Sequence, residues 1–350
     1  MLEKLSRLDG VAGQEKAVGE AIAARLREIG LIPETDRMGN IIARREPADP
    51  TDPAAAVHML LCAHMDEVGL LITDITAEGF LKFSPVGGVD RAVLPAKRVR
   101  LHGSLPGVVG IKAIHLQKPE ERKKLPEIDA FYIDIGATNR EDAEKQVKIG
   151  DMACFEDSWR EFGSELFMGK ALDDRAGCAL LLEILARDHP CRLTGAFTVQ
   201  EEIGLRGAQV LANSVRADLV VVLEATAALD APETEPEETV TVLGGGPVCY
   251  LMDAGAVYPR ELVRAVTDCA RTEGVPLQYR RGAAGGNDAG ALQTAGAGLR
   301  VVTLALPCRY IHTMHSVASR EDYRNWKKLI LAFIARQCAA ATPPPPGKGA

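Results

Sequence analysis

The chain has 350 residues, of which 47% are hydrophobic and 25% are charged, a composition typical of globular proteins and long enough for two domains. Its net charge of -7 leaves no basic stripe to neutralise a phosphate backbone, so we expect no nucleic-acid partner. No apolar run approaches the roughly 20 residues that cross a bilayer, and the first residues lack a signal-peptide core. The eight cysteines are scattered without a C-x-x-C pair, which predicts reduced thiols in a cytoplasmic protein.

The N-terminal part of the chain is expected to combine one helix with short strands. An amphipathic helix is predicted over residues 14–29, because Val18, Ile22 and Leu26 recur on one face. Strands are predicted to follow at residues 40–44 and 58–63.

The pattern changes between residues 70 and 162. Short β-like runs alternate there with turns rich in glycine and proline, and a helical period is expected only around residues 140–147. This segment therefore predicts a small β domain of barrel type.

Strands and helices alternate again from residue 163 onward, which is typical of a mostly parallel sheet with helices on both faces. The predicted fold is therefore α/β, with one domain formed by residues 1–69 and 163–341 and a β insert at 70–162. Two segments are expected to be unstructured, the Pro/Glu-rich loop 230–239 and the proline-rich tail 342–350.

Acids and histidines gather at the predicted carboxyl ends of the apolar strands, and in open α/β sheets these ends form the binding crevice. The side chains in question are His64 and Asp66 after strand 58–63, Glu201 and Glu202 after 193–199, Glu224 after 219–223, and His312 after 299–306. Asp173 and Asp174 open a predicted helix.

Each group alone also has an ordinary structural interpretation. Asp173 and Asp174 suit the positive end of a helix, the two adjacent glutamates suit a solvated turn, and His312 could be a core histidine with His315 as the alternative ligand. Together, however, they match a two-metal hydrolase, in which one carboxylate bridges two ions and another deprotonates a water. Carboxylate and imidazole ligands favour zinc, cobalt or manganese.

Competing catalytic motifs are absent from the sequence. It contains no H-E-x-x-H zinc motif, no G-x-x-x-x-G-K-[ST] phosphate loop and no G-x-S-x-G nucleophile elbow.

Six stretches resemble the tetrahedral-aminopeptidase family, peptidase family forty-two of clan MH, which includes glutamyl and deblocking aminopeptidases. They occur in the order of the family and are AHMDEVGLLIT (63–73), GKALDDRAGCALLLEIL (169–185), TVQEEIGLRGA (198–208), VVLEAT (221–226), GGNDAGALQ (285–293) and PCRYIH (307–312). The resemblance implies a metal-dependent aminopeptidase that removes the N-terminal residue of peptides with a free N-terminus.

The resemblance also implies a role for each acid and histidine. Asp173 would bridge two divalent ions, with zinc or cobalt favoured and manganese possible. The other ligands would be His64 and Glu224 for one ion, and Glu202 and His312 for the second. Glu201 would be the general base, and Asp66 would orient His64. The β insert would be a dimerisation domain, and the dimers would build a hollow tetrahedral dodecamer.

The sequence departs from the family pattern at three places. Glu224 stands where aspartate is frequent, Asn287 where threonine is common, and Thr313-Met314-His315 where a Ser-Pro pair is more usual. Two other functions stay open at this point. One is a metal-dependent deacylase or amidohydrolase of small N-acyl compounds, and the other is a non-catalytic scaffold.

Overall fold

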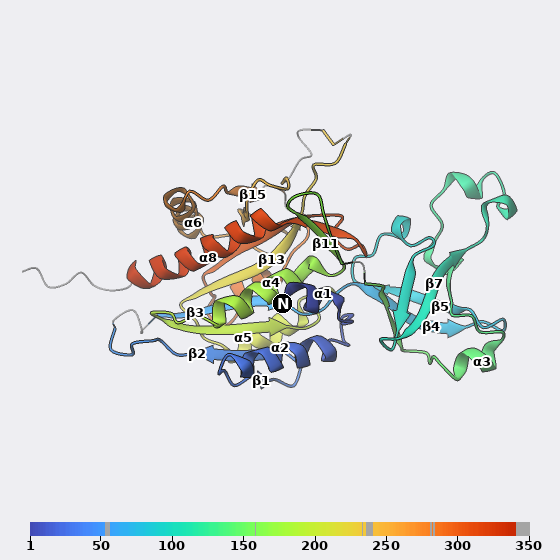
Figure 1. Ribbon diagram of the computed structural model, residues 1–350, viewed down its shortest axis with the longest axis horizontal. Helices are drawn as coiled ribbons and strands as arrows, with labels where there is room; N and C mark the ends of the chain where they lie inside the picture. The colour runs from blue at the N-terminus through green and yellow to red at the C-terminus, as the bar shows by residue number, and fades with distance from the viewer. Residues whose placement is uncertain are drawn as a thin grey trace, which may run out of the picture.

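The computed structural model describes residues 1–52, 57–157, 159–232, 234–235, 241–280, 282 and 284–340. The proline-rich tail 342–350 lies outside these residues, and the loop 230–239 lies partly outside them. The chain forms a large α/β body, from which a β-barrel projects at one end (Figure 1).

A mixed sheet of eleven strands forms the centre of the α/β body within the described residues. In spatial order its strands are β1 (Glu34–Thr35), β2 (Ile41–Arg45), β12 (Arg192–Thr198), β3 (His58–His64), β13 (Leu219–Ala227), β16 (Val301–Arg309), β17 (Ser316–Ser319), β11 (Leu166–Gly169) and β10 (Arg160–Phe162). In addition, β14 (Val248–Tyr250) pairs with β16, and β15 (Gln278–Arg280) pairs with β14.

The four central strands β12, β3, β13 and β16 run parallel to one another, whereas the strands toward both edges pair mainly in antiparallel fashion. Successive residues of β3 are buried on opposite faces of the sheet. Leu61 and Ala63 join one apolar core, and Leu60 and Cys62 join the other. Such continuous apolar runs are expected where helices cover both faces of a parallel sheet.

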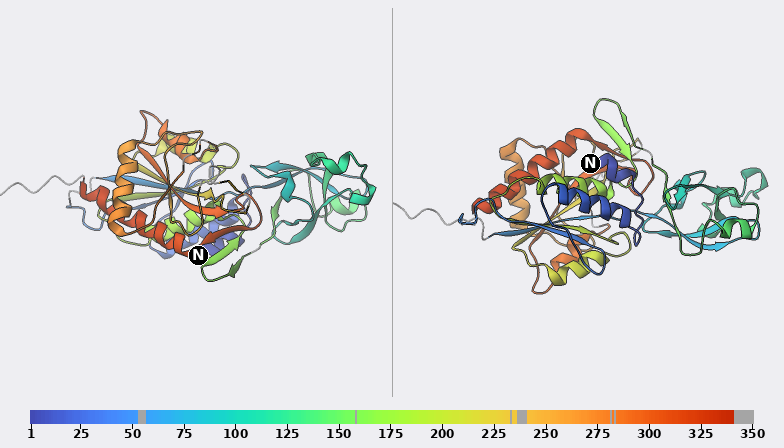
Figure 2. Two further views of the ribbon diagram at one scale, coloured as in Figure 1. Left: turned by 90° about the horizontal axis from the view of Figure 1, so that it is seen from above. Right: turned by 60° about the horizontal axis from the view of Figure 1, so that its bottom comes forward.

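Helices cover both faces of the sheet, as Figure 2 shows. Five helices contribute apolar side chains to the core on one face and two to the core on the other. The first group is α1 (Leu2–Arg7), α2 (Lys16–Glu28), α4 (Leu172–Leu185), α6 (Arg260–Glu273) and α8 (Arg320–Ala340), and the second is α5 (Arg206–Ser214) and α7 (Asp288–Gln293). The helix predicted over residues 14–29 is confirmed as α2.

The β insert is a closed barrel of six antiparallel strands, which confirms the predicted small β domain. Around the barrel the strands are β4 (Gly69–Ile75), β5 (Leu81–Val86), β8 (Phe131–Asp134), β7 (Leu105–Ile111), β6 (Arg98–Leu101) and β9 (Met152–Phe155), and the short helix α3 (Arg140–Glu144) lies against it. Alternate residues such as Leu70, Ile72 and Leu81 fill its interior. Strand β10, which the predicted division places in the insert, pairs with β11 in the large sheet.

The barrel lies beyond the carboxyl ends of the parallel strands. Strand β3 ends at His64, and the first barrel strand begins five residues later at Gly69 (Figure 1). The predicted crevice at the strand ends therefore lies where the two bodies meet. None of the described helices is long and apolar enough to cross a bilayer.

Candidate metal centre

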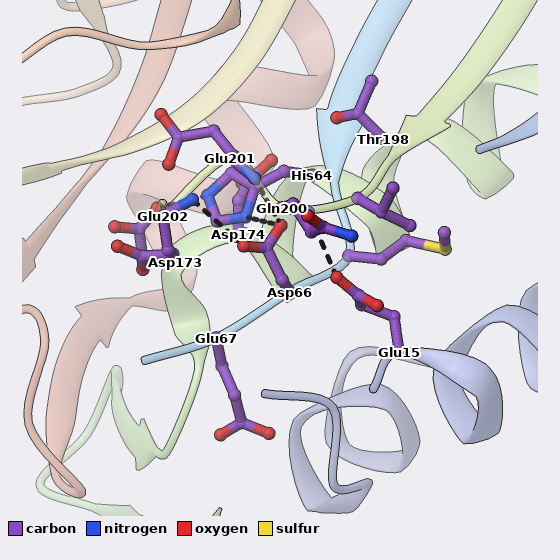
Figure 3. Close-up of polar contacts among 12 residues, drawn as sticks. Glu15, His64, Asp66, Glu67, Asp173, Asp174, Thr198, Gln200, Glu201 and Glu202 are labelled. Atoms are coloured by element: carbon purple, nitrogen blue, oxygen red, sulfur yellow. Dashed lines mark hydrogen bonds and ion pairs between the residues drawn. The ribbon is translucent and has the colours of Figure 1, made fainter. Parts of the chain in front are cut away.

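The acids and histidines selected from the sequence lie together at this edge of the sheet. Figure 3 shows His64, Asp66, Asp173, Glu201 and Glu202 among them. They come from the ends of several elements: His64 ends β3, Asp66 follows it, Glu201 and Glu202 form the turn after β12, Glu224 lies in β13, His312 follows β16, and Asp173 lies in the first turn of α4. Strand β13 continues three residues beyond Glu224, which therefore projects from within a strand rather than from its end.

Asp173 lies between two imidazole rings. Its Oδ1 is 3.2 Å from Nε2 of His64, and its Oδ2 is 3.2 Å from Nε2 of His312. The two oxygens of one carboxylate thus face two different ligand nitrogens, which is the arrangement that a bridging carboxylate needs.

A second carboxylate accompanies each histidine. Glu224 Oε1 is 3.8 Å from Nε2 of His64, and Glu202 Oε2 is 3.4 Å from Nε2 of His312. Potential ligand atoms within 4.8 Å of one another form two groups, one of His64, Asp174 and Glu224 and the other of His64, Asp173 and Glu202. Asp174, to which the sequence analysis assigned no separate role, therefore lies in the cluster as well.

Burial governs the electrostatics of the cluster. It raises the pKa of Glu224 and Glu201 well above the ordinary value, and that of Glu202 to about 7. Burial also opposes ionisation of Asp173, but hydrogen bonds from His312 and His64 outweigh it and hold the pKa of Asp173 below its usual range. So many buried carboxylates are costly in free energy unless cations balance their charge, so the cluster favours the binding of cations.

Asp66 connects the histidine with the two glutamates. This fully buried carboxylate accepts the backbone N–H of Glu201 through Oδ1 at 2.9 Å and that of Glu202 through Oδ2 at 3.0 Å. Its Oδ1 is also 3.5 Å from Nδ1 of His64. One side chain therefore fixes the turn that carries both glutamates and faces the imidazole, an arrangement that orients metal ligands.

Glu15 also supports this turn, and the sequence analysis did not select it. Its Oε1 accepts the backbone N–H of Gln200 at 3.1 Å and that of Gly13 at 2.8 Å (Figure 3). Gln200 has a φ of 57°, a left-handed conformation that is uncommon for a residue other than glycine. Three consecutive N–H groups, those of residues 200–202, are thus held by carboxylates from outside the turn.

His312 rather than His315 faces the cluster. His312 has a φ of 59°, and its Nδ1 is 3.2 Å from the carbonyl oxygen of Gly88. A Cβ atom at Gly88 would lie 3.0 Å from that nitrogen, closer than most Cβ contacts, so the approach favours glycine. His315 makes no contact with Asp173 among the described residues, and the charged groups near it are Lys97 and Arg98.

Asn287 has a structural role at the position where the sequence departs from the family pattern. Its side chain caps α7 by accepting the backbone N–H of Ala289 at 2.9 Å, and its amide donates to Asp253. The next residue, Asp288, accepts a 2.5 Å hydrogen bond from Thr198 beneath the cluster, and burial raises its pKa to about 6.

The donor set fits divalent metal ions. It combines imidazole nitrogens with carboxylate oxygens, and the buried Oδ2 of Asp174 has no hydrogen-bond partner within the described part of the chain. Hard oxygens with borderline nitrogens suit zinc, cobalt and manganese alike.

Comparison with known proteins identifies the family of the chain. Residues 39–329 match the M42 glutamyl aminopeptidase family. A putative aminopeptidase of Acetivibrio thermocellus is 34% identical, over 95% of this chain and 97% of the relative. Among solved structures, the TET aminopeptidase of Thaumarchaeota archaeon SCGC AB-539-E09 is 32% identical with a TM-score of 0.91, covering 97% of this chain and 96% of the other.

The names of other relatives describe an assembly or the N-terminal residue on which the enzyme acts. The Pyrococcus horikoshii TET1 peptidase, which can assemble into a tetrahedron or a large octahedral shell, is 32% identical with a TM-score of 0.83, covering 95% of this chain and 98% of the other. A lysyl aminopeptidase of Pyrococcus furiosus and a glutamyl aminopeptidase of Lactococcus lactis are each 28% identical, over 95% of this chain and 96% and 94% of the relatives. The chain therefore belongs to the M42 glutamyl aminopeptidase family and is a metallo-aminopeptidase.

Proposed function

We propose that the protein holds two divalent ions and removes the N-terminal residue of peptides that have a free N-terminus. Asp173 would contribute to both metal sites, His64 and Glu224 would complete one of them, and Glu202 and His312 would complete the other. The observation that carries this proposal is the placement of the two Asp173 oxygens, each 3.2 Å from a different imidazole.

In this proposal the ions, when bound, polarise the scissile carbonyl and acidify a water molecule. Glu201 takes one proton from the attacking water as the water oxygen bonds to the carbonyl carbon, and it donates that proton to the amine nitrogen when the peptide C–N bond breaks. Burial raises the pKa of Glu201, which suits a group that must both take up and release a proton. Asp66 supports this role, because it fixes the backbone of Glu201 and the adjacent ligand Glu202.

Turnover of aminoacyl p-nitroanilides tests the proposal, with their N-acetylated forms and N-acetyl amino acids measured in parallel. Chelated protein should be inactive, and zinc, cobalt or manganese should restore hydrolysis of the free aminoacyl substrates alone. Hydrolysis of the N-acetyl compounds instead would point to a deacylase. A chain that binds metal but acts on neither class would be a scaffold.

We further propose that the barrel mediates dimerisation and that dimers build a tetrahedral dodecamer in the cytoplasm. Apolar side chains on the barrel stand exposed in the single chain, among them Ile114, Leu116 and Leu125. Exposed apolar patches mark interaction surfaces. All eight cysteines are buried and none of them is in a disulfide, which suits a reducing compartment. Light scattering should give about twelve times the mass of one chain, whereas a monomer would contradict the assembly.

A further inference from the structure

A buried cluster of three charged side chains, Glu67, Lys170 and Arg175, lies next to the candidate metal centre. Each of the three residues is 3% exposed or less. Glu67 comes three residues after His64 in the sequence. Lys170 and Arg175 lie on either side of Asp173. The cluster therefore joins the two chain segments that carry these two candidate ligands.

Glu67 links the segment that follows β3 to the start of α4. Its two carboxylate oxygens accept hydrogen bonds from Nζ of Lys170 at 2.6 and 2.8 Å. Nη2 of Arg175 donates to the same carboxylate at 3.3 Å, and Nε of Arg175 donates to the carbonyl oxygen of Met65 at 2.7 Å. Hydrogen bonds between charged groups are roughly twice as strong as those between neutral groups. The separation of the two segments is therefore held by contacts that lie outside the ligand cluster.

The carboxylate of Glu67 is directed away from the candidate ligands. Figure 3 shows it pointing away from His64, whereas the carboxylate of the preceding residue, Asp66, points toward the imidazole. Within the described part of the chain, the groups of potential metal ligands do not include Glu67. Glu67 can therefore act on the ligands only through the backbone that it fixes.

The N-terminal segment supplies further acceptors to the two cations of the cluster. Arg175 donates to the carbonyl oxygens of Leu5 and Leu8 at 2.7 and 3.2 Å, and Lys170 donates to that of Leu8 at 2.8 Å. Buried charges that are paired and hydrogen-bonded in this way interact strongly, because little water is present to screen them. Loss of Glu67 would leave two buried cations without their shared counter-charge.

We propose that Glu67, together with Lys170 and Arg175, positions the metal ligands and thereby raises the affinity of the enzyme for its ions. The cluster keeps Nε2 of His64 and Oδ1 of Asp173, which are 3.2 Å apart, close enough to share one ion. Groups that orient metal ligands without binding the metal contribute substantially to its affinity. The inference rests on the proposed metal site, and it assigns a role to three residues that bind no ion themselves.

The test is a titration of chelated protein with Co²⁺, followed by the visible absorption of the bound ion, in the wild type, Glu67→Gln and Lys170→Met. Methionine at 170 removes the ammonium group but leaves Glu67 paired with Arg175, so this variant serves if Glu67→Gln does not fold. Thermal melts of the metal-free proteins give the loss of stability in each variant.

Asp322→Asn is the matched control for a general weakening of the fold. Asp322 is also buried and accepts the backbone N–H groups of Gly244 and Gly246, and it lies in the first turn of α8. Within the described residues it belongs to neither group of potential metal ligands.

We expect Glu67→Gln and Lys170→Met to weaken Co²⁺ binding by about 10- to 100-fold, the usual effect of removing a group that orients metal ligands. The absorption of the bound Co²⁺ should also change in both variants, because it depends on the geometry of the ligands. Asp322→Asn should bind Co²⁺ within about 3-fold of the wild type and with an unchanged spectrum, even though its Tm falls.

Two results would overturn the inference and leave the proposed function intact. One is wild-type affinity for Co²⁺ in the folded variants of Glu67 or Lys170, and the other is an equal loss of affinity in Asp322→Asn. A wild type that binds no Co²⁺ would instead overturn the proposed metal site, and this inference with it. The titration of the wild type therefore distinguishes the two failures.

Discussion

Replacement of Asp66 by asparagine removes one of the two acceptors that hold the turn of Glu201 and Glu202. Asparagine keeps one oxygen, so one backbone N–H would face an amide NH₂ group instead of a carboxylate at about 3 Å. A hydrogen bond to a charged group contributes about 1.5–3 kcal/mol. If that energy is lost from the transition state, kcat/KM falls by roughly 10- to 150-fold.

The assay is kcat/KM of Asp66→Asn on a p-nitroanilide substrate at saturating metal, with bound metal measured by mass spectrometry. Asp322→Asn is the matched control, because Asp322 is also fully buried and also accepts two backbone N–H groups, those of Gly244 and Gly246 at 2.7 and 2.8 Å. We expect Asp322→Asn to lose stability but to stay within about 3-fold in kcat/KM. Equal activity losses in both variants would refute the role assigned to Asp66.

Further predictions concern the base, its support and the metal. Glu201→Gln should keep its bound metal and lose about 10²- to 10⁴-fold in kcat, the range for removal of a general base, and a residual rate near wild type would remove Glu201 from that role. Glu15→Ala should lower kcat by about 10-fold, because the backbone N–H of Gln200 loses its acceptor. Glu15→Gln should restore much of the rate, since one oxygen remains. An unchanged kcat in Glu15→Ala would contradict the proposal that Glu15 supports the turn of Glu201 and Glu202. Chelation should lower the Tm by several degrees, because metal at about 100 times its Kd stabilises the fold by about 2.7 kcal/mol, and a Tm independent of metal in a thermal melt would argue against the site.

The fold class could be predicted because its physical causes are local. The continuous apolar run of β3 requires burial on both faces, and the spacing of Val18, Ile22 and Leu26 requires one buried helix face. The short runs between glycines and prolines likewise indicated the barrel. Each of these patterns lies within a few residues of sequence and depends little on tertiary context.

Part of the cluster was predictable for a similar reason. Parallel strands place their carboxyl ends at one edge, so His64 and the turn of Glu201 and Glu202 had to approach each other once their strands were assigned. The choice of His312 over His315 could not be made from strand ends, because it depends on the left-handed backbone at His312 and on its contact with Gly88.

The residues that support the turn of Glu201 and Glu202 could not be predicted from the sequence, for a different reason. Glu15 acts on the backbone N–H of a residue 185 positions away, and a backbone contact leaves no pattern of side-chain types in the sequence. Asp174 was ambiguous because a helix start explains adjacent acids equally well.

Anomalous diffraction from crystals loaded with zinc or cobalt tests the central claim most directly. The proposed site predicts two peaks on opposite sides of the Asp173 carboxylate, one beside His64 and Glu224 and the other beside Glu202 and His312. A single peak, or peaks that do not share Asp173, would contradict the two-metal assignment.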